Sequence, residues 1–244
     1  MVQLLSNRIL MKERFLEHFG QEGGSISTDA ICGATLRARG LTARRGNQRL
    51  FHQLDFEITA GQLAWLRGQN GSGKTTLLRM VAGLAQPDDG ALLWKDKPLA
   101  QAPDYHRQMV YIGHNCGLKD DLTALESLLF LVRLHGQSCT QAQAELALRQ
   151  MGVSHRRNLL VRHLSQGQKR RVALARLVLQ TDTPMWVLDE PFDALDDGGT
   201  ATVKSLVHDC VRRGGIVLLT SHIPVVVDGL TALEISLDQS TRAS

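Results

Sequence analysis

A glycine-rich segment has the composition of a phosphate-binding loop. It reads Gly68-Gln69-Asn70-Gly71-Ser72-Gly73-Lys74-Thr75 and matches the pattern G-x-x-x-x-G-K-[ST] in full. Small side chains let successive backbone N–H groups turn toward phosphate oxygens, and a helix beginning at Lys74 would add the positive end of its dipole. Lys74 would contact the β- and γ-phosphates, the Thr75 hydroxyl could ligate Mg²⁺, and Thr76 would complete the segment. We therefore predict a nucleoside triphosphate site.

Two adjacent carboxylates follow a strongly apolar run later in the chain. Residues 185–188 read MWVL, and Asp189 and Glu190 come directly after them. A buried strand does not tolerate two carboxylates inside a sheet, so we expect them at its C-terminal edge, where open α/β sheets bind ligands. There Asp189 would hold Mg²⁺, directly or through water, and Glu190 is the candidate general base for an attacking water.

A histidine ends another apolar run, GIVLLTSH, at residues 215–222. A parallel strand beside residues 185–188 would bring His222 to the same sheet edge as Glu190. Its imidazole could there reach a γ-phosphate and orient the water or the base. Taken alone, a histidine at the end of a strand is more often an ordinary surface or core residue.

The elements that must position these residues alternate between strands and helices. Strand-like runs lie at residues 50–59, 62–68, 91–95, 109–113, 185–190 and 215–222. A helical pattern follows the glycine-rich loop, and another separates the last two runs. Strands alternating with helices predict a parallel sheet that is covered on both faces.

The middle of the chain has a different character. Residues 114–162 contain no strand-like run and predict a helical insertion. Thr123 and Glu126 form a T-x-x-E capping box at the start of one helix. A second helical segment ends at Gly152, because glycine readily adopts the left-handed conformation that terminates helices.

Composition excludes several classes of protein. The 244 residues are 43% hydrophobic and 21% charged, which argues against a disordered or coiled-coil chain. A net charge of +4 is compatible with an anionic ligand, nucleic acid or a membrane surface and selects none of them. Four cysteines far apart, with no CxxC pair, argue against a disulfide scaffold or zinc ribbon and favour a reducing compartment. No apolar run approaches the 18 or so residues of a membrane span.

With two further motifs, these residues resemble the nucleotide-binding domain of an ABC ATPase. Leu164-Ser165-Gln166-Gly167-Gln168 stands where that family has its LSGGQ-type sequence, Ala194-Leu195-Asp196 matches the D-loop, and His222 matches the switch histidine. The resemblance covers about residues 36–225 in the expected order. It implies an α/β fold: a P-loop NTPase (RecA-like) parallel-sheet core with a helical ABC subdomain.

The chain divides into three parts, because residues 1–34 stand apart, with a first half that could form a short amphipathic helix and a second half typical of a linker. Residues 1–34 would be a poorly ordered N-terminal extension, and residues 35–230 the ABC ATPase domain. Its helical subdomain would cover about residues 114–162. Residues 231–244 would form a C-terminal tail.

The resemblance also implies a head-to-tail homodimer that closes over ATP and Mg²⁺. The residues facing ATP bound to Lys74 of the other subunit would be Ser165, Gln166, Gly167, Gln168 and Asp196. This is physically reasonable, because Ser165 and nearby backbone N–H groups offer a second helix N-terminus to the γ-phosphate. ATP would hold the dimer together, and hydrolysis would release it.

Two positions depart from the common ABC pattern. His114, followed by Asn115, stands where a glutamine normally reaches for Mg²⁺ and water. A neutral histidine could bind the metal there, or the interaction is lost. The aromatic residue that usually stacks on adenine is absent near Arg44 and Arg45, where an arginine plane could stack instead.

Residues 111–136, with the Gly-His pair and LTALE, resemble the haem exporter ATP-binding subunit of cytochrome c maturation, the CcmA family. That resemblance implies a peripheral ATPase on the cytoplasmic face of the bacterial inner membrane. Its partners would be integral membrane subunits of the CcmB and CcmC type. ATP hydrolysis would drive delivery of haem or release of a haem-loaded chaperone. The sequence has no Cys-x-x-Cys-His, so no direct haem contact is expected.

Other readings stay open. A soluble ABC ATPase acting on nucleic acid or ribosomes would suit the basic run at residues 169–171. Against it stand the single cassette and only about ninety residues between Lys74 and Ser165. We expect the basic run to form a solvated helix face, and no nucleic-acid partner. A non-hydrolysing regulatory module conflicts with Glu190 and His222, and another small exporter remains an alternative.

Overall fold

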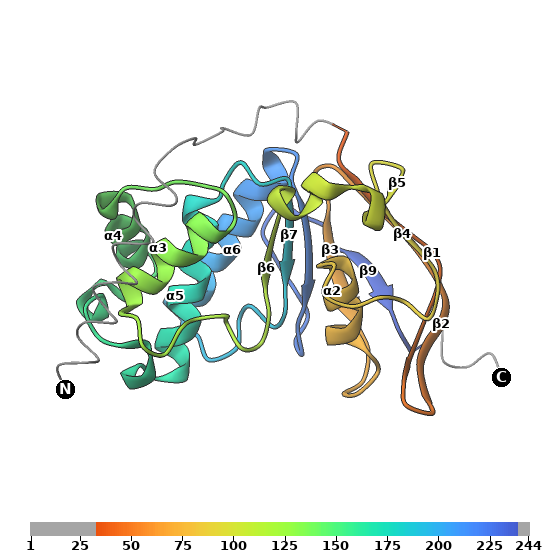
Figure 1. Ribbon diagram of the computed structural model, residues 1–244, viewed down its shortest axis with the longest axis horizontal. Helices are drawn as coiled ribbons and strands as arrows, with labels where there is room; N and C mark the ends of the chain where they lie inside the picture. Colours follow the sequence, from red (N-terminus) through yellow and green to blue (C-terminus); the bar gives the residue numbers. More distant parts are fainter. Residues whose placement is uncertain (1–32, 239–244) are drawn as a thin grey trace.

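A five-stranded parallel sheet lies at the centre of the computed structural model, which describes residues 33–238 (Figure 1). In spatial order its strands are β6 (Met109–Ile112), β7 (Met185–Leu188), β8 (Ile216–Thr220), β3 (Leu63–Arg67) and β9 (Leu233–Ser236). Every neighbouring pair runs parallel, which confirms the predicted sheet. The predicted N-terminal extension falls almost wholly outside the described residues.

A second sheet is antiparallel and has four strands. In spatial order they are β2 (Gln48–Thr59), β1 (Thr35–Arg45), β4 (Asp89–Trp94) and β5 (Lys97–Pro98). The sequence analysis found strand patterns in parts of β2 and β4 but neither β1 nor this sheet. In β1 the pairing with β2 shifts register between Ala38 and Leu41, so the alternation that marks a strand is interrupted.

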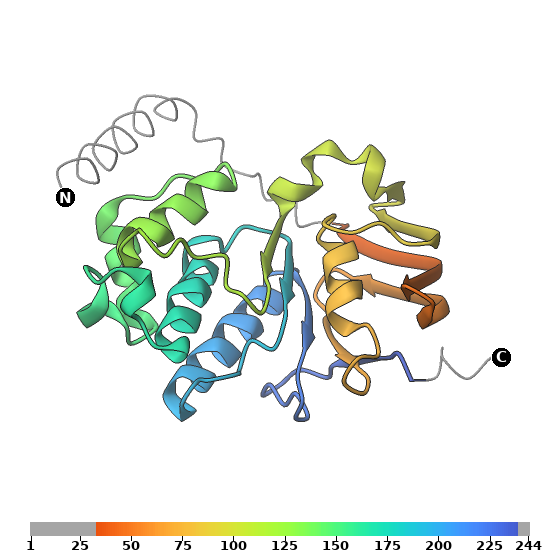
Figure 2. The same ribbon diagram turned by 60° about the horizontal axis from the view of Figure 1, so that its bottom comes forward.

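Side chains of the central strands alternate between two cores. On β7, Met185 and Val187 pack into the core that also contains α2 (Lys74–Val81) and the antiparallel sheet. Trp186 and Leu188 point to the opposite face, which is covered by α5 (Gln166–Leu179) and α6 (Asp197–Arg212). The predicted covering of both faces is therefore confirmed, and α2 lies between the two sheets (Figure 2).

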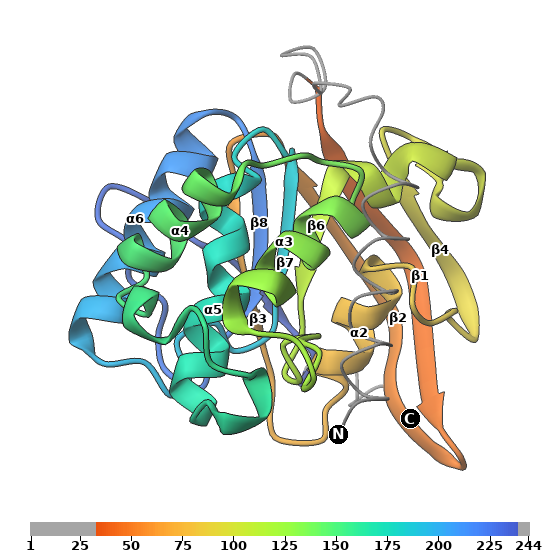
Figure 3. The same ribbon diagram turned by 60° about the vertical axis from the view of Figure 1, so that its left-hand side comes forward.

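Helices dominate the segment between β6 and β7 (Figure 3). They are α3 (Ala124–Leu134) and α4 (Gln141–Gln150), with 3₁₀ turns η4 (Ser154–Arg156) and η5 (Val161–His163) before α5; η2 (Leu99–Gln101) and η3 (Pro103–Gln108) precede β6. Both hydrogen bonds of the predicted capping box between Thr123 and Glu126 are present. No helix within residues 33–238 is long and apolar enough to cross a membrane.

The end of the described chain differs from the expected tail. Residues 233–236 form β9, which pairs in parallel with β3, and Leu237 after it is fully buried. The tail prediction for residues 231–244 is thus wrong over this strand. Its four residues carry one buried apolar side chain, Ile235, which is too short a pattern to indicate a strand.

Candidate nucleotide-binding site

The glycine-rich loop lies between β3 and the first turn of α2, as the sequence predicts. Gly73 is the N-cap of α2 and has a φ of 103°, a left-handed conformation. A Cβ atom built there would lie 3.0 Å from Leu50 Cβ and 3.1 Å from Phe51 Cδ1. The loop can therefore pack this closely on β2 only with glycine at this position.

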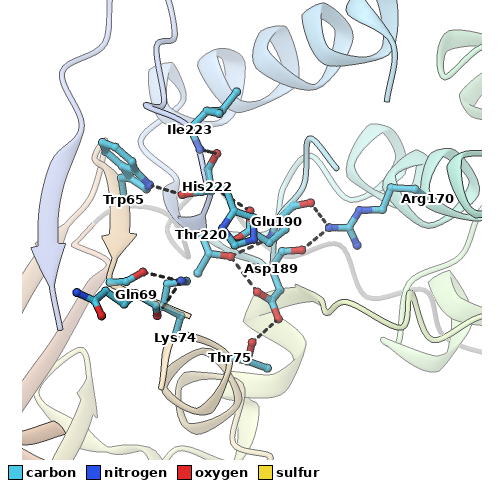
Figure 4. Close-up of polar contacts among 12 residues, drawn as sticks. Trp65, Gln69, Lys74, Thr75, Arg170, Asp189, Glu190, Thr220, His222 and Ile223 are labelled. Carbon is cyan, nitrogen blue, oxygen red and sulfur yellow. Dashed lines mark hydrogen bonds and ion pairs between the residues drawn. The ribbon is translucent and has the colours of Figure 1, made fainter. Parts of the chain in front are cut away.

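Lys74 folds back over the loop it follows. Its ammonium group donates hydrogen bonds to the carbonyl oxygens of Gly68, at 2.7 Å, and Gln69, at 3.3 Å (Figure 4). The positive charge thus lies at the mouth of the loop. Ser72 Oγ is buried without a hydrogen-bond partner. Such a loop offers a cation and unpaired polar groups to an anion.

A cavity of about 290 Å³ opens beside the loop. The residues that line it are Arg45, Leu50, Gln69, Asn70, Gly71, Gly73, Lys74, Thr75, Thr76, His114, Asp189, Glu190, Asp193 and His222. The structure thus brings together the predicted phosphate loop, carboxylate pair and switch histidine. His114 also faces this cavity. The sequence analysis did not single out Leu50 or Asp193.

Asp189 receives hydrogen bonds from two threonines. Its two carboxylate oxygens accept from Thr75 Oγ1 at 3.0 Å and from Thr220 Oγ1 at 2.9 Å. The residue is 3% exposed at the end of β7. An aspartate beside a threonine hydroxyl is an all-oxygen donor set, which fits a hard cation such as Mg²⁺.

Glu190 is held from several sides. Its backbone N–H donates to Thr220 Oγ1 at 2.8 Å, and its Oε2 accepts from the backbone N–H of His222 at 3.1 Å. Burial raises the pKa of the Glu190 carboxyl; His222 lowers it, while Asp193 and Asp189 raise it further. A φ of 50° places its backbone in a region that a non-glycine residue rarely adopts. Such strain is common at functional sites and needs support from the surroundings.

His222 reaches this edge because β8 lies directly beside β7. Leu188 pairs with Leu219, so the residues that follow each strand are neighbours. The separation between His222 Nε2 and Glu190 Oε1 is 3.5 Å. The predicted proximity of these residues is confirmed, whereas the catalytic role of each stays a prediction.

The LSGGQ-type residues do not line this cavity. Ser165 is the N-cap of α5 and forms a reciprocal capping box with Gln168. Asp196 is the N-cap of α6 and accepts a hydrogen bond from the N–H of Gly199 at 2.7 Å. Gln168 and Asp196 help to line a separate open hollow of about 520 Å³. Within one chain, Gln168 and Asp196 therefore line a different hollow from Lys74.

An arginine that the sequence analysis placed on a solvated face is buried under the carboxylate pair. Arg170 is 5% exposed, and its guanidinium donates to the carbonyl oxygens of Gly113, Asp189 and Glu190. The solvated-face prediction for residues 169–171 is wrong here. It is also wrong for Arg171, which donates to Met151 O at 2.7 Å and pairs with Asp196. Helix α5 turns these side chains toward other parts of the fold.

The fold and the order of these motifs define the chain as a P-loop ATPase of the ABC class. The sequence profile of the ABC transporter family matches residues 51–193. The chain belongs to the CcmA family of cytochrome c biogenesis ATP-binding export proteins. It is 48% identical to the Pseudomonas aeruginosa protein of that name over 188 residues, which are 77% of this chain and 92% of the relative. It is 45% identical to the Escherichia coli K12 protein over 210 residues, or 86% and 99% of the two chains.

A solved structure described as the ATP binding subunit of an ABC transporter supports the same fold. It is 28% identical, covers 77% of this chain and 79% of its own, and superposes with a TM-score of 0.67. The sequence-based predictions of family and fold are therefore confirmed. This chain is an ATP-binding, ATP-hydrolysing subunit of the ABC transporter type.

We predict that Arg170→Lys folds but loses at least about tenfold in kcat for ATP hydrolysis, with little change in nucleotide Kd. A lysine ammonium is a compact charge and cannot bridge three carbonyls as the planar guanidinium does. Steady-state kinetics and a fluorescent-nucleotide titration would measure both values. Arg212→Lys, at an exposed position on α6, is the control. Equal kcat in the two variants would contradict a positioning role for Arg170.

Proposed function

We propose that this chain hydrolyses ATP to drive delivery of haem, or release of a haem-loaded chaperone, in cytochrome c biogenesis. The observation that carries the ATPase part is the convergence of Lys74, Thr75, Asp189, Glu190 and His222 on one cavity. The biological role rests on relatives named as cytochrome c biogenesis export proteins, which this chain matches over 92% and 99% of their lengths. The sequence contains no Cys-x-x-Cys-His, so the chain would drive the process without touching haem.

Each residue has a task in this proposal. The loop from Gly68 to Thr76 cradles the triphosphate, and Lys74 exchanges its two carbonyl partners for phosphate oxygens. Thr75 and Asp189 would hold Mg²⁺, which neutralises phosphate charge when bound. Glu190 accepts the proton of the water that attacks the γ-phosphorus, and ADP leaves. His222 orients Glu190 or a γ-phosphate oxygen, and His114 faces the same space from the end of β6.

The second half of the site would come from another copy of the chain. Helix α5 opens with Ser165, Gln166, Gly167 and Gln168, and Asp196 is the N-cap of α6. None of these residues lines the cavity beside the phosphate loop. A helix N-terminus presents unpaired N–H groups and partial positive charge, which suits a γ-phosphate. Two chains packed head to tail would enclose ATP from both sides, as one loop alone does not.

The proposed location follows from the export role. An ATPase that powers export must contact integral membrane subunits, and we propose those of the CcmB and CcmC type on the cytoplasmic face of the bacterial inner membrane. Residues 35–230 would act as the ATPase domain, and the helices within about 114–162 as its helical subdomain. Arg170 is buried and Arg171 is paired with Asp196, so two of the three basic side chains that favoured a nucleic-acid partner are engaged within the chain.

Glu190→Gln should keep ATP binding and lower the hydrolysis rate by at least ~10²-fold, because the amide cannot accept the proton. The variant should also accumulate an ATP-bound dimer, since the ligand that holds the two chains is not consumed. Phosphate release and sedimentation with ATP would report the two effects. Turnover at the wild-type rate would remove Glu190 from the role of base.

Ser165→Arg, made in the Glu190→Gln chain, should abolish the ATP-dependent dimer while each chain still binds ATP. The bulky cation replaces the N-cap on the partner surface and leaves the phosphate loop intact. Lys74→Ala should instead weaken nucleotide binding itself. Nucleotide titration and sedimentation separate the two cases. An unchanged dimer with Ser165→Arg would exclude the proposed contribution in trans.

The acidic limb of kcat/KM against pH, which reports the free enzyme, should have its midpoint above about 4.3, the pKa of a free glutamate. The raised pKa of Glu190 means that its carboxyl gains a proton, and ceases to act as a base, at a higher pH than in water. Rates at ATP concentrations well below KM would be measured, together with circular dichroism at each pH to confirm folding. Full activity in a folded protein down to about pH 4.3 would contradict this.

Purification of the complete chain from bacterial membranes, with its associated subunits, tests the biological role. We expect mass spectrometry to identify integral membrane proteins of the CcmB and CcmC type. Membrane subunits unrelated to haem handling would point to another exporter. Ribosomal or DNA-bound partners would overturn the export function as a whole.

A further inference from the structure

Three potential metal ligands converge at the edge of the catalytic cavity. One carboxylate oxygen each from Glu190 and Asp193 and a ring nitrogen of His222 all lie within 4.8 Å of one another. Within residues 33–238 this is the single group of three His, Cys, Asp or Glu side chains arranged so closely. Asp193 has no task in the hydrolysis proposed above. We propose that these three residues form an inhibitory site for Zn²⁺ or a similar transition-metal dication.

The spacing suits a metal of this kind. Zn²⁺ binds oxygen and nitrogen ligands at about 2.0–2.2 Å, so two ligands at a tetrahedral angle lie roughly 3.4 Å apart. His222 Nε2 and Glu190 Oε1 are 3.5 Å apart. These two atoms could therefore share one ion with little movement. The Asp193 side chain is exposed, and its carboxylate oxygen lies within 4.8 Å of the other two ligand atoms. A small movement of this side chain would bring it to the same ion.

One oxygen of the cluster lacks a hydrogen bond. The Glu190 side chain is 9% exposed, and its Oε1 is buried with no hydrogen-bond partner. Its other oxygen, Oε2, is already bonded to the backbone N–H of His222. A buried carboxylate oxygen that points toward an imidazole and a second carboxylate is a ligand that a cation would satisfy.

The donor set separates this site from the proposed Mg²⁺ site. One imidazole and two carboxylates, with a fourth position open, suit Zn²⁺ and its neighbours in the first transition series. Mg²⁺ prefers oxygen ligands and retains its waters, which favours Thr75 and Asp189. The two kinds of cation would thus select different sites in one cavity.

Occupancy would stop hydrolysis without displacing ATP. This step rests on the proposed function, in which Glu190 and His222 act on the attacking water. A metal bound to Glu190 Oε1 and His222 Nε2 withholds both groups from that water. The phosphate loop and Lys74 take no part in the metal site and would remain free to hold the triphosphate.

Metal binding is tested first by titrating the metal-free full chain with Co²⁺, whose visible absorption reports a tetrahedral site. We expect one Co²⁺ per chain, and at least about tenfold weaker binding after Asp193→Ala and Asp193→Asn. His208→Ala is the matched control, because partly exposed His208 lies 3.4 Å from the Asp209 carboxylate and does not line the cavity. Equal affinity in wild type and both Asp193 variants would overturn the proposal.

Inhibition is tested next by adding Zn²⁺ to the ATPase reaction with Mg²⁺ in excess. Asp193→Ala should need at least about tenfold more Zn²⁺ for half-inhibition, with each variant compared with its own rate in the absence of Zn²⁺. Equal sensitivity of this variant and wild type would overturn the inhibitory role. Normal turnover by Glu190→Gln would instead contradict the proposed function, and the Co²⁺ titration would still decide the metal site.

Discussion

The site depends on keeping two adjacent carboxylates hydrogen-bonded at the end of β7, a strand whose four residues are fully buried. Each neighbouring element contributes to satisfying them. Thr75 of α2 and Thr220 of β8 donate hydrogen bonds to the Asp189 carboxylate. The backbone N–H of His222, two residues after β8, donates to the Glu190 carboxylate. Arg170 of α5 donates to the backbone carbonyls of both acidic residues. The hydrogen bonds that make burial of this edge tolerable are therefore the same ones that fix the site geometry.

The antiparallel sheet fixes the other wall of the cavity. Helix α2 packs between the two sheets, and its N-cap Gly73 rests on Leu50 and Phe51 of β2. The phosphate loop is therefore positioned by apolar packing as well as by its own conformation. The β1–β2 hairpin also brings Arg45 to the cavity, where no Phe, Tyr or Trp is among the described lining residues. Leu50 of the same hairpin also lines the cavity, and stacking of the Arg45 guanidinium on adenine stays a prediction.

Short sequence patterns were sufficient to predict much of this structure. The glycine pattern of the loop, the apolar runs of β7 and β8 and the Thr123 capping box each specify their element within a few residues of sequence. Strand β1 was missed because a register shift interrupts its alternation, and β9 because it is too short to show one. The burial of Arg170 depends on which side of α5 faces β7, and a run of three basic residues cannot reveal that. The proximity of Asp193 to His222 likewise depends on the pairing of β7 with β8, which no local pattern in the sequence reveals.

Helix α5 joins the two halves of the proposed ATPase. Ser165 caps its N-terminus, which we propose faces the partner chain, and Arg170 lies five residues later, about 7.5 Å along the helix axis. A helix of 14 residues packed on the central sheet moves as a unit rather than bending between these positions. In the proposed dimer, closure of Ser165 on the partner's nucleotide would therefore shift the guanidinium that holds the Asp189 and Glu190 carbonyls. The orientation of Glu190 in one nucleotide site would then depend on whether the other site holds ATP. This dependence would pass through helix α5 and the three hydrogen bonds of Arg170.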